Sequence, residues 1–473
     1  MSARRSRTGL ESHGSRRPSR GPKRFLGLAL LAGAILLGLA LLRTGVAPTI
    51  SIESDQPGIG RDSKMTVRLE AEGRGLGEVL VELVQEDRRI LLAERRYRPR
   101  APWAFWGQRD SADVIVAEVG SEALGERLRE GPAVVRVEAR PPAAWLRKGD
   151  PVVAEREFEI MLRPPALGVL SSQHYPAQGG CELVVYSVGK TSIRDGVSVA
   201  GDWFPGFQLP GAPAGRRFAL FAVPFDLQAA DSIRLSAEDA VGNRVETAFV
   251  DRLQPRPYDQ DVITVTTRFM EKVVPEVIAN SPSIREAGDL LGSYVAINRD
   301  LRAQNAERLA QLATQSRPAF LWSEPFVGLR NAQVMASFAD RRTYVFDGQP
   351  VDRQDHLGFD LASVKRAEVP AANRGVVVLA EYFGIYGNAV VLDHGYGLMS
   401  LYGHLSTLEV AAGQEVARGQ SLGRTGETGL AGGDHLHFTM LLQGKAVNPV
   451  EWWDEAWIRN RLKSKLGAAF QEG

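Results

Sequence analysis

The chain has 473 residues, with 57 Lys and Arg against 56 Asp and Glu, and a formal net charge of +1. At about 150 residues per domain, this length predicts about three domains, and the balanced charge argues against a nucleic-acid-binding protein. A composition of 44% hydrophobic and 24% charged residues excludes a disordered or collagen-like chain. The single cysteine, Cys181, excludes an intrachain disulfide and a zinc cluster built from cysteines.

The charge is unevenly distributed, and an apolar run explains why. Residues 1–24 hold eight basic residues and one acidic residue, a net charge of +7, which leaves −6 for the other 449 residues. The uncharged run FLGLALLAGAILLGLALL follows at residues 25–42. As a helix it is about 27 Å long, close to the thickness of the hydrocarbon core of a bilayer. We therefore predict a basic cytoplasmic tail at residues 1–24, a single transmembrane anchor at 25–42, and an extracytoplasmic location for the rest.

A cleaved signal peptide is the alternative interpretation of this run. Its apolar region usually has about 7–15 residues and ends at an A-x-A-like site. Here the run is longer, and the best exit, at residues 45–47, places Pro48 directly after the cut. These features favour an uncleaved anchor and leave the cleaved form as the alternative.

Two β-rich segments follow the anchor. Short alternating stretches separated by Gly, Pro and Asp predict a β-sandwich module at residues 48–166, which ends near Pro164-Pro165. A second β-sandwich is predicted at 167–253, and its AEDAVGN segment resembles bacterial immunoglobulin-like modules. The predicted strands are at residues 49–52, 65–69, 133–137, 181–188, 218–223 and 233–237.

A helical connector is predicted at residues 259–318, after a proline-rich linker. Ser283 and Glu286 have the spacing of a capping box, and apolar residues then recur at helical intervals up to Tyr294. A second helix is predicted at 301–312. The two interpretations of these helices are that they pack on the next domain, or that they form a lid over its groove.

Histidines gather in the C-terminal part of the chain. Of the seven histidines, those at 356, 394, 404, 435 and 437 fall within 82 residues. His356 and Asp360 are four positions apart, and His435 and His437 project from one face of a strand. A catalytic zinc site uses three protein ligands of these types and keeps a fourth position open, where zinc lowers the pKa of water and polarises a carbonyl. An HExxH helix, a GxSxG elbow and a plausible nucleophilic cysteine are all absent from the sequence.

The sequence from about residue 333 to 454 resembles the M23 (LytM-type, lysostaphin-like) zinc peptidases. The resemblance places the peptidase domain at residues 325–456, followed by a C-terminal tail at 457–473. Its motifs occur in the family's order, namely HLGFD at 356–360, VPA at 369–371, GNAVVLDHG at 387–395, LYGHL at 401–405, VARGQ at 416–420, GRTG at 423–426, GDHLHF at 433–438 and VNP at 447–449.

The resemblance implies a compact antiparallel β-fold with a groove and one Zn²⁺ per chain. It assigns His356, Asp360 and His437 as metal ligands, and His404 and His435 as catalytic residues that serve the water and the transition state. Tyr402 and Asn388 are candidate residues of the substrate groove, although structural roles are equally compatible with the sequence. His394 is expected to pack in its turn. Asp434, where the family often has a neutral residue, is in a position to raise the pKa of a neighbouring histidine.

The expected fold class is therefore mainly β with a helical segment: one transmembrane helix, tandem β-sandwiches, a helical connector and an M23 domain. The resemblance and the anchor together predict a zinc metalloendopeptidase of the inner membrane that cuts peptidoglycan cross-links in the periplasm. Its partners would be stem peptides, the membrane through residues 25–42, and proteins of the cell-wall machinery. The alternatives are a non-catalytic LytM-like activator of another wall hydrolase, and a metalloprotease acting on a protein.

Overall fold

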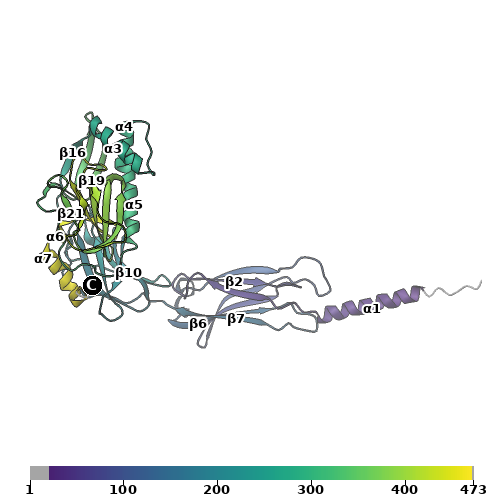
Figure 1. Ribbon diagram of the computed structural model, residues 1–473. Helices are drawn as coiled ribbons and strands as arrows, with labels where there is room; N and C mark the ends of the chain where they lie inside the picture. The colour runs from purple at the N-terminus through teal and green to yellow at the C-terminus, as the bar shows by residue number, and fades with distance from the viewer. Residues whose placement is uncertain (1–20, 471–473) are drawn as a thin grey trace, which may run out of the picture. The chain divides into compact units, whose positions relative to one another are not determined.

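The structure is a computed structural model that describes residues 21–470, so most of the predicted basic tail, residues 1–20, lies outside the described part (Figure 1). The chain divides into two compact units between Leu162 and Arg163, and each is described by itself. Strands dominate both units, and most of their pairings are antiparallel. The predicted mainly β class is confirmed.

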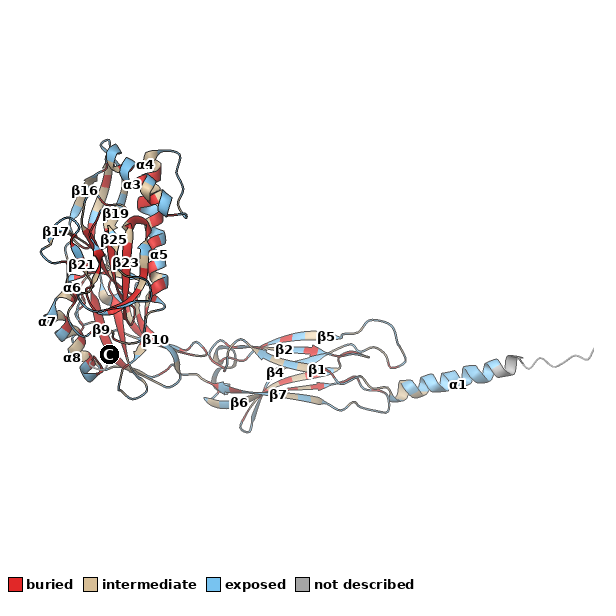
Figure 2. Ribbon diagram, viewed as in Figure 1, coloured by how far each residue is buried: buried red, intermediate tan, exposed pale blue. Residues whose placement is uncertain are grey.

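The first unit begins with helix α1 (Gly21–Leu42). Its window Phe25–Leu42 has the length and hydropathy of a membrane span, and none of it is buried in the protein. Figure 2 shows most of residues 25–42 of this helix as exposed. A signal sequence near the N-terminus has the same properties. In water, so much apolar surface would be unfavourable, which is consistent with a helix that resides in lipid at some stage.

The rest of the first unit consists of two antiparallel sheets. One has the order β1-β2-β5 and the other the order β4-β3-β6-β7. Alternate residues point inward, and Val79, Val81 and Leu83 of β3 are at most 1% exposed. This period of two is what the sequence predicts for a sandwich. The strands are β1 (Thr49–Ser54), β2 (Lys64–Glu70), β3 (Glu78–Gln85), β4 (Arg88–Arg96), β5 (Ala112–Glu118), β6 (Gly131–Arg140) and β7 (Val152–Ile160), with the short α2 (Ser121–Leu124) and η1 (Gly125–Arg127) between β5 and β6.

The second unit begins with two further sheets, of order β11-β10-β14-β15 and β12-β13-β9-β8. Their core is continuous with that of the C-terminal domain. Phe218 of β13, for example, contacts Phe320 and Tyr396, with ring centroids 5.6 and 4.9 Å apart. This second sandwich therefore shares its core with the C-terminal domain. Its elements are β8 (Leu167–Val169), β9 (Cys181–Val188), β10 (Ser192–Val199), β11 (Asp202–Pro205), β12 (Phe207–Gln208), β13 (Arg216–Ala222), η2 (Ala230–Ser232), β14 (Ile233–Asp239) and β15 (Arg244–Thr247).

The segment predicted as a helical connector starts with a strand. β16 (Gln260–Thr264) pairs in parallel with β18 (Asp340–Phe346), and α3 (Thr267–Asn280), α4 (Leu290–Ala296), η3 (Ile297–Leu301) and α5 (Arg302–Ala313) lie between them in the sequence. The predicted capping box of Ser283 and Glu286 is wrong. Helix α4 begins seven residues after Ser283, where the Asp289 carboxylate accepts the Gly292 N–H, and the positive φ of Gly288 (85°) interrupts a helix before it.

The C-terminal domain is built on a sheet of order β17-β20-β28-β24-β23-β22-β26, with β29 beside β28 and a small sheet β21-β27-β25. Leu309 and Leu312 of α5 cover one face of the main sheet, and the shared core covers the other. Double coverage explains why β23 and β24 are buried almost throughout. The strands are β17 (Gln333–Ala336), β19 (Gln349–His356), β20 (Phe359–Ala362), β21 (Glu368–Pro370), β22 (Gly375–Tyr382), β23 (Asn388–Gly395), β24 (Leu398–Leu405), β25 (Thr407–Leu408), β26 (Glu415–Val416), β27 (Ser421–Arg424), β28 (Leu436–Leu442) and β29 (Lys445–Val447), with η4 (Gly384–Tyr386) between β22 and β23.

The predicted C-terminal tail is folded as far as residue 470. Short helical segments, α6 (Val450–Trp453), α7 (Glu455–Trp457), η5 (Ile458–Lys463), α8 (Ser464–Leu466) and η6 (Gly467–Phe470), follow the last strand. Ile458, Leu462 and Phe470 are at most 3% exposed within the shared core. This segment is therefore part of the second unit and contributes to its core.

Candidate metal centre

Strand pairing brings the predicted ligands together. Asp360 of β20 is paired with His437 of β28, and His356 ends the strand just before β20. His356 Nε2 lies 3.0 Å from Asp360 Oδ1 and 3.1 Å from His437 Nδ1. The distance from His437 Nδ1 to Asp360 Oδ1 is 2.9 Å. The three residues thus form a compact group in which each offers one ligand atom, and the two histidines are buried.

The hydrogen bonds of the two histidines decide which nitrogen of each ring is free. His356 Nδ1 lies 2.9 Å from the carbonyl oxygen of Ser337, which can only accept, so this nitrogen carries the proton. The Thr439 hydroxyl donates to the Leu357 carbonyl at 2.8 Å, so it accepts from His437 Nε2 at 2.9 Å. The free lone pairs are therefore on His356 Nε2 and His437 Nδ1, the two nitrogens that face Asp360.

This arrangement fits a metal ion of the zinc type. Two imidazole lone pairs and one carboxylate oxygen converge on one point, and the neutral rings have no proton left to place between them. Such a group of acceptors repels itself unless a cation lies at its centre. Three ligands from histidine and a carboxylate, with space left for a fourth, are the donor set of a catalytic zinc site.

A basic side chain that sequence analysis missed holds the carboxylate. Arg342 of β18 places Nη2 3.2 Å from Asp360 Oδ2, which leaves Oδ1 facing the two histidines. Burial opposes ionisation of Asp360, but the interactions with the neighbouring histidines outweigh burial and hold the pKa of Asp360 well below its usual range. No local motif marks Arg342, because only the tertiary packing of β18 beside β19 brings it to the site.

His404 and His435 lie next to the metal-ligand group. Their ring centroids are 4.8 Å apart, and that of His404 is 5.8 Å from that of His437. His404 Nδ1 donates to the Thr428 carbonyl at 2.8 Å, and His435 Nδ1 donates to the Gly433 carbonyl at 2.8 Å. Each ring therefore uses Nδ1 for a backbone carbonyl and leaves Nε2 for another partner. His404 has a φ of +63°, which is rare for a residue other than glycine and is typical of functional sites.

The environment shifts the pKa values of these two histidines in opposite directions. Burial, together with the neighbouring His435 and His437, holds the pKa of His404 well below its usual value. Burial also lowers the pKa of His435, but the attraction of Asp360, whose Oδ1 lies 3.5 Å from His435 Nε2, outweighs burial and raises the pKa overall. A pair of titratable groups with diverging pKa values is the usual basis for a division between base and acid.

Comparison with known proteins identifies this part of the chain. Residues 354–449 match the family model described as "Peptidase family M23". The chain contains an M23 peptidase domain. The match covers 96 residues, and it includes His356, Asp360, His404, His435 and His437.

Two curated relatives and one solved structure show the range of the similarity. The chain is 36% identical over 121 residues to the peptidoglycan DD-endopeptidase ShyA of Vibrio cholerae, which covers 25% of this chain and 27% of that protein. It is 39% identical over 95 residues to the murein hydrolase activator EnvC of Escherichia coli, covering 20% and 23%. A putative M23 peptidase structure from Pseudomonas aeruginosa is 22% identical, covering 59% of this chain and 94% of the other, with a TM-score of 0.36. The chain thus spans about a quarter of the length of these curated relatives.

The two candidate groove residues, Tyr402 and Asn388, form hydrogen bonds with neighbouring residues of the M23 domain. Tyr402 is 1% exposed, and its hydroxyl accepts the Ala372 N–H at 2.7 Å and lies 2.9 Å from the Ser400 hydroxyl, so in this structure it contacts the interior of the sheet. Asn388 Nδ2 donates to the Leu405 carbonyl at 3.1 Å and likewise fixes backbone.

Two further residues of the M23 domain have local partners. His394 is buried in its turn between the Arg374 carbonyl and Ser400, each 2.7 Å away, as expected. Asp434 does not act on His435 as the sequence suggested. Its carboxylate accepts the Thr425 hydroxyl at 2.6 Å, and the carboxylate that raises the pKa of His435 is Asp360.

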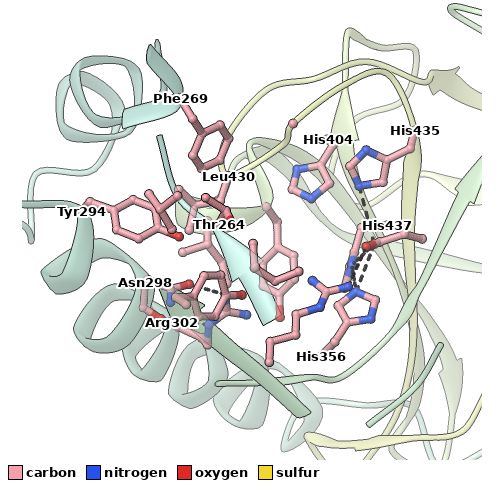
Figure 3. A pocket seen from close by; sticks show the side chains of 18 residues that line it. Thr264, Phe269, Tyr294, Asn298, Arg302, His356, His404, Leu430, His435 and His437 are labelled. Atoms are coloured by element: carbon pink, nitrogen blue, oxygen red, sulfur yellow. Dashed lines mark hydrogen bonds and ion pairs between the residues drawn. The ribbon is translucent and has the colours of Figure 1, made fainter. Parts of the chain in front are cut away.

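A cavity of about 350 Å³ opens beside the predicted ligands (Figure 3). The M23 domain supplies one wall, with His404, His435 and Leu430. The segment before the domain supplies the opposite wall, with residues of β16, α3, α4, η3 and α5 and the residue directly after β16: Ile263, Thr264, Val265, Phe269, Tyr294, Asn298 and Arg302. The volume is at the lower end of the range for small-ligand sites. The helices therefore border the candidate site, which is compatible with both interpretations of them made from the sequence.

Proposed function

We propose that this chain is a zinc-dependent endopeptidase that hydrolyses peptide cross-links of peptidoglycan. Helix α1 would hold it in the cytoplasmic membrane, with the M23 domain on the extracytoplasmic side. The observation that carries the proposal is the completeness of the site. Three candidate ligands have their lone pairs fixed toward one point by hydrogen bonds, and two further histidines lie on the open side.

In this proposal His356 Nε2, Asp360 Oδ1 and His437 Nδ1 hold the zinc ion. When bound, zinc supplies Lewis-acid polarisation of the scissile carbonyl and favours ionisation of water. Ser337 and Thr439 keep the two ligand histidines in the required tautomer, and Arg342 orients the carboxylate. Such partners of the ligands usually contribute strongly to metal affinity.

The two remaining histidines would carry the proton transfers. His404 is buried and held neutral, and its Nδ1 proton is engaged with Thr428, so its Nε2 lone pair can accept a proton. The geometry of His435 suits the donor role. With both ring nitrogens protonated, it donates to Gly433 through Nδ1, and its Nε2, which lies 3.5 Å from Asp360 Oδ1 in this structure, would donate its proton to the developing negative charge or the leaving amine.

The relatives support peptidoglycan as the substrate class. One is an endopeptidase of peptidoglycan and the other an activator of murein hydrolases, so both named functions concern the cell wall. Their similarity is confined to about a quarter of each protein. The substrate is therefore proposed for the M23 domain, and the two β-sandwiches are proposed to position that domain between membrane and wall.

The second candidate function is a non-catalytic activator, which the similarity to EnvC favours. An activator needs a docking surface, and it has no need for histidines whose tautomers are set for a metal. The described site keeps these features, so we favour catalysis.

Incubation of the full-length protein with peptidoglycan sacculi tests the proposal, with His437→Ala as the matched inactive variant. New muropeptides released by the wild type and absent with the variant are expected. If zinc is bound and neither protein releases muropeptides, the endopeptidase proposal fails. If both proteins instead accelerate an added amidase equally, the activator function is correct.

A further inference from the structure

Two loops of the first unit present aromatic side chains to solvent. These aromatic loops, residues 101–109 and 141–149, connect β4 to β5 and β6 to β7. Trp106 is 76% exposed and Trp145 is 74% exposed, and the other exposed apolar side chains of the loops are Trp103, Phe105 and Leu146. Among the described residues 43–162, every exposed aromatic side chain belongs to these two loops. Exposed aromatic clusters of this kind usually mark an interaction surface.

The aromatic loops lie at the end of helix α1. The Leu146 N–H donates to the Leu41 carbonyl at 3.0 Å, and the Gly45 N–H donates to the Pro142 carbonyl at 2.9 Å. Arg43, one residue beyond the helix, lies over the ring of Phe105 at 4.3 Å. Both loops are therefore joined to the residues at which the predicted membrane span ends.

A buried arginine fixes this arrangement. Arg74 is 4% exposed, and its guanidinium donates to the carbonyls of Arg43 at 2.9 Å, Arg100 at 2.8 Å and Ala143 at 2.8 Å. One side chain thus ties the end of the helix to both loops. The aromatic residues are consequently held at a set distance from the end of the span.

The charge of the loops suits the lipid surface. Within the aromatic loops, residues 101–109 contain one arginine and residues 141–149 contain one arginine and one lysine, and neither loop contains an acidic residue. Basic residues next to a span are attracted to anionic headgroups, by about 1 kcal/mol each near the surface. Tryptophan is enriched at the interface between membrane and water, where its ring is apolar and its N–H remains solvated.

We propose that the aromatic loops insert into the lipid headgroup region on the extracytoplasmic side, as a second membrane contact beside α1. The inference rests on the proposed membrane span of α1. It goes beyond an anchor, because a single helix fixes only a point of attachment. Two loops that also touch the bilayer restrict how the first β-sandwich tilts relative to the membrane, so this sandwich is held against the membrane surface.

Tryptophan quenching in lipid tests the inference. The full-length protein is reconstituted in vesicles of phosphatidylcholine and phosphatidylglycerol, with or without lipids brominated near the headgroup. Three of the eight tryptophans belong to the loops, so brominated lipid should reduce the emission of the wild type by roughly a third. The triple variant W103S/W106S/W145S should lose most of this quenching. The matched control V114S/V116S, which replaces exposed apolar residues on strand β5 of the same sandwich, should keep it.

The possible failures are distinguishable. If alkaline extraction leaves the wild type in the vesicles but brominated lipid does not quench it, α1 is embedded and the loop contact is overturned. If alkaline extraction removes the wild type, the membrane span itself fails, and the inference fails with it. If the triple variant is quenched as strongly as the wild type, tryptophans elsewhere are responsible and the loop assignment is wrong. Far-ultraviolet circular dichroism checks that each variant is folded.

Discussion

Replacing Thr439 with valine should weaken zinc binding with little effect on the fold. The hydroxyl of Thr439 connects the Leu357 carbonyl to Nε2 of His437, and this chain keeps the lone pair on Nδ1 directed at the metal position. Valine has nearly the same shape but has no oxygen to accept the Nε2 proton. His437 is then free to carry its proton on Nδ1, where it would bond to Asp360, 2.9 Å away, and block the ligand atom.

The size of the effect follows from the partners that are lost. Removal of a partner that orients a metal ligand typically costs about 10- to 100-fold in affinity, or about 1.4–2.7 kcal/mol. The metal-free protein should lose only about 0.5–1.5 kcal/mol for each hydrogen bond removed. Zinc affinity is measured by competition with a chromophoric chelator at fixed pH, and the stability of the metal-free protein by thermal unfolding.

Two further variants make this prediction specific. T439S keeps the hydroxyl and should bind zinc nearly as tightly as the wild type. T425V makes the same substitution at a site that is also fully buried, but there the hydroxyl donates to Asp434, so zinc affinity should be preserved. The reasoning is refuted if T439V binds zinc as tightly as the wild type, or if T425V weakens binding to the same extent.

Three further predictions concern metal removal, the pocket wall and pH. Zinc at 100-fold over its Kd should stabilise the folded protein by about 2.7 kcal/mol, so chelation should lower the Tm in calorimetry, and an unchanged Tm would contradict the metal site. Glu276 of α3 accepts hydrogen bonds from Gly429 N at 2.8 Å and the Tyr382 hydroxyl at 3.0 Å; if the helices restrict the pocket, E276A should raise hydrolysis of a soluble peptide several-fold, whereas equal rates argue for simple packing. Burial raises the pKa of Glu451 to about 7 despite the neighbouring Arg256, so the folded state keeps a proton that the unfolded state releases near pH 4.5, and this contribution to stability falls as pH rises. Relative to the wild type, E451Q should gain about 2–3 kcal/mol in free energy of unfolding between about pH 5 and pH 8 in chemical denaturation, and a pH-independent difference would contradict this.

The strands were predictable where an alternation of apolar and polar residues marks them in the sequence. Alternating residues with one inward face predict β2 and β6 of the first unit, and the predicted strand at 181–188 coincides with β9. The joining of the second sandwich to the peptidase domain was not predictable. It depends on aromatic contacts such as that of Phe218 with Tyr396, whose partners lie far apart in the sequence. Local capping at Asp289 likewise outweighs the more distant Ser283 and Glu286 pattern.

In the candidate site, the metal ligands were predictable from the sequence and most of their supporting partners were not, and this difference has a physical cause. Metal ligands must be histidine or carboxylate, and those on one strand or turn have fixed spacings, so His356, Asp360 and His437 stand out in the sequence. Their supporting partners face no such chemical restriction. The proton of His356 needs only an oxygen, which here is the Ser337 carbonyl, and any residue at that position offers the same carbonyl. Only Thr439 among these partners acts through its side chain on a ligand histidine and lies within two residues of it. It is therefore the partner for which a side-chain substitution can separate the geometry of the site from the identity of its ligands.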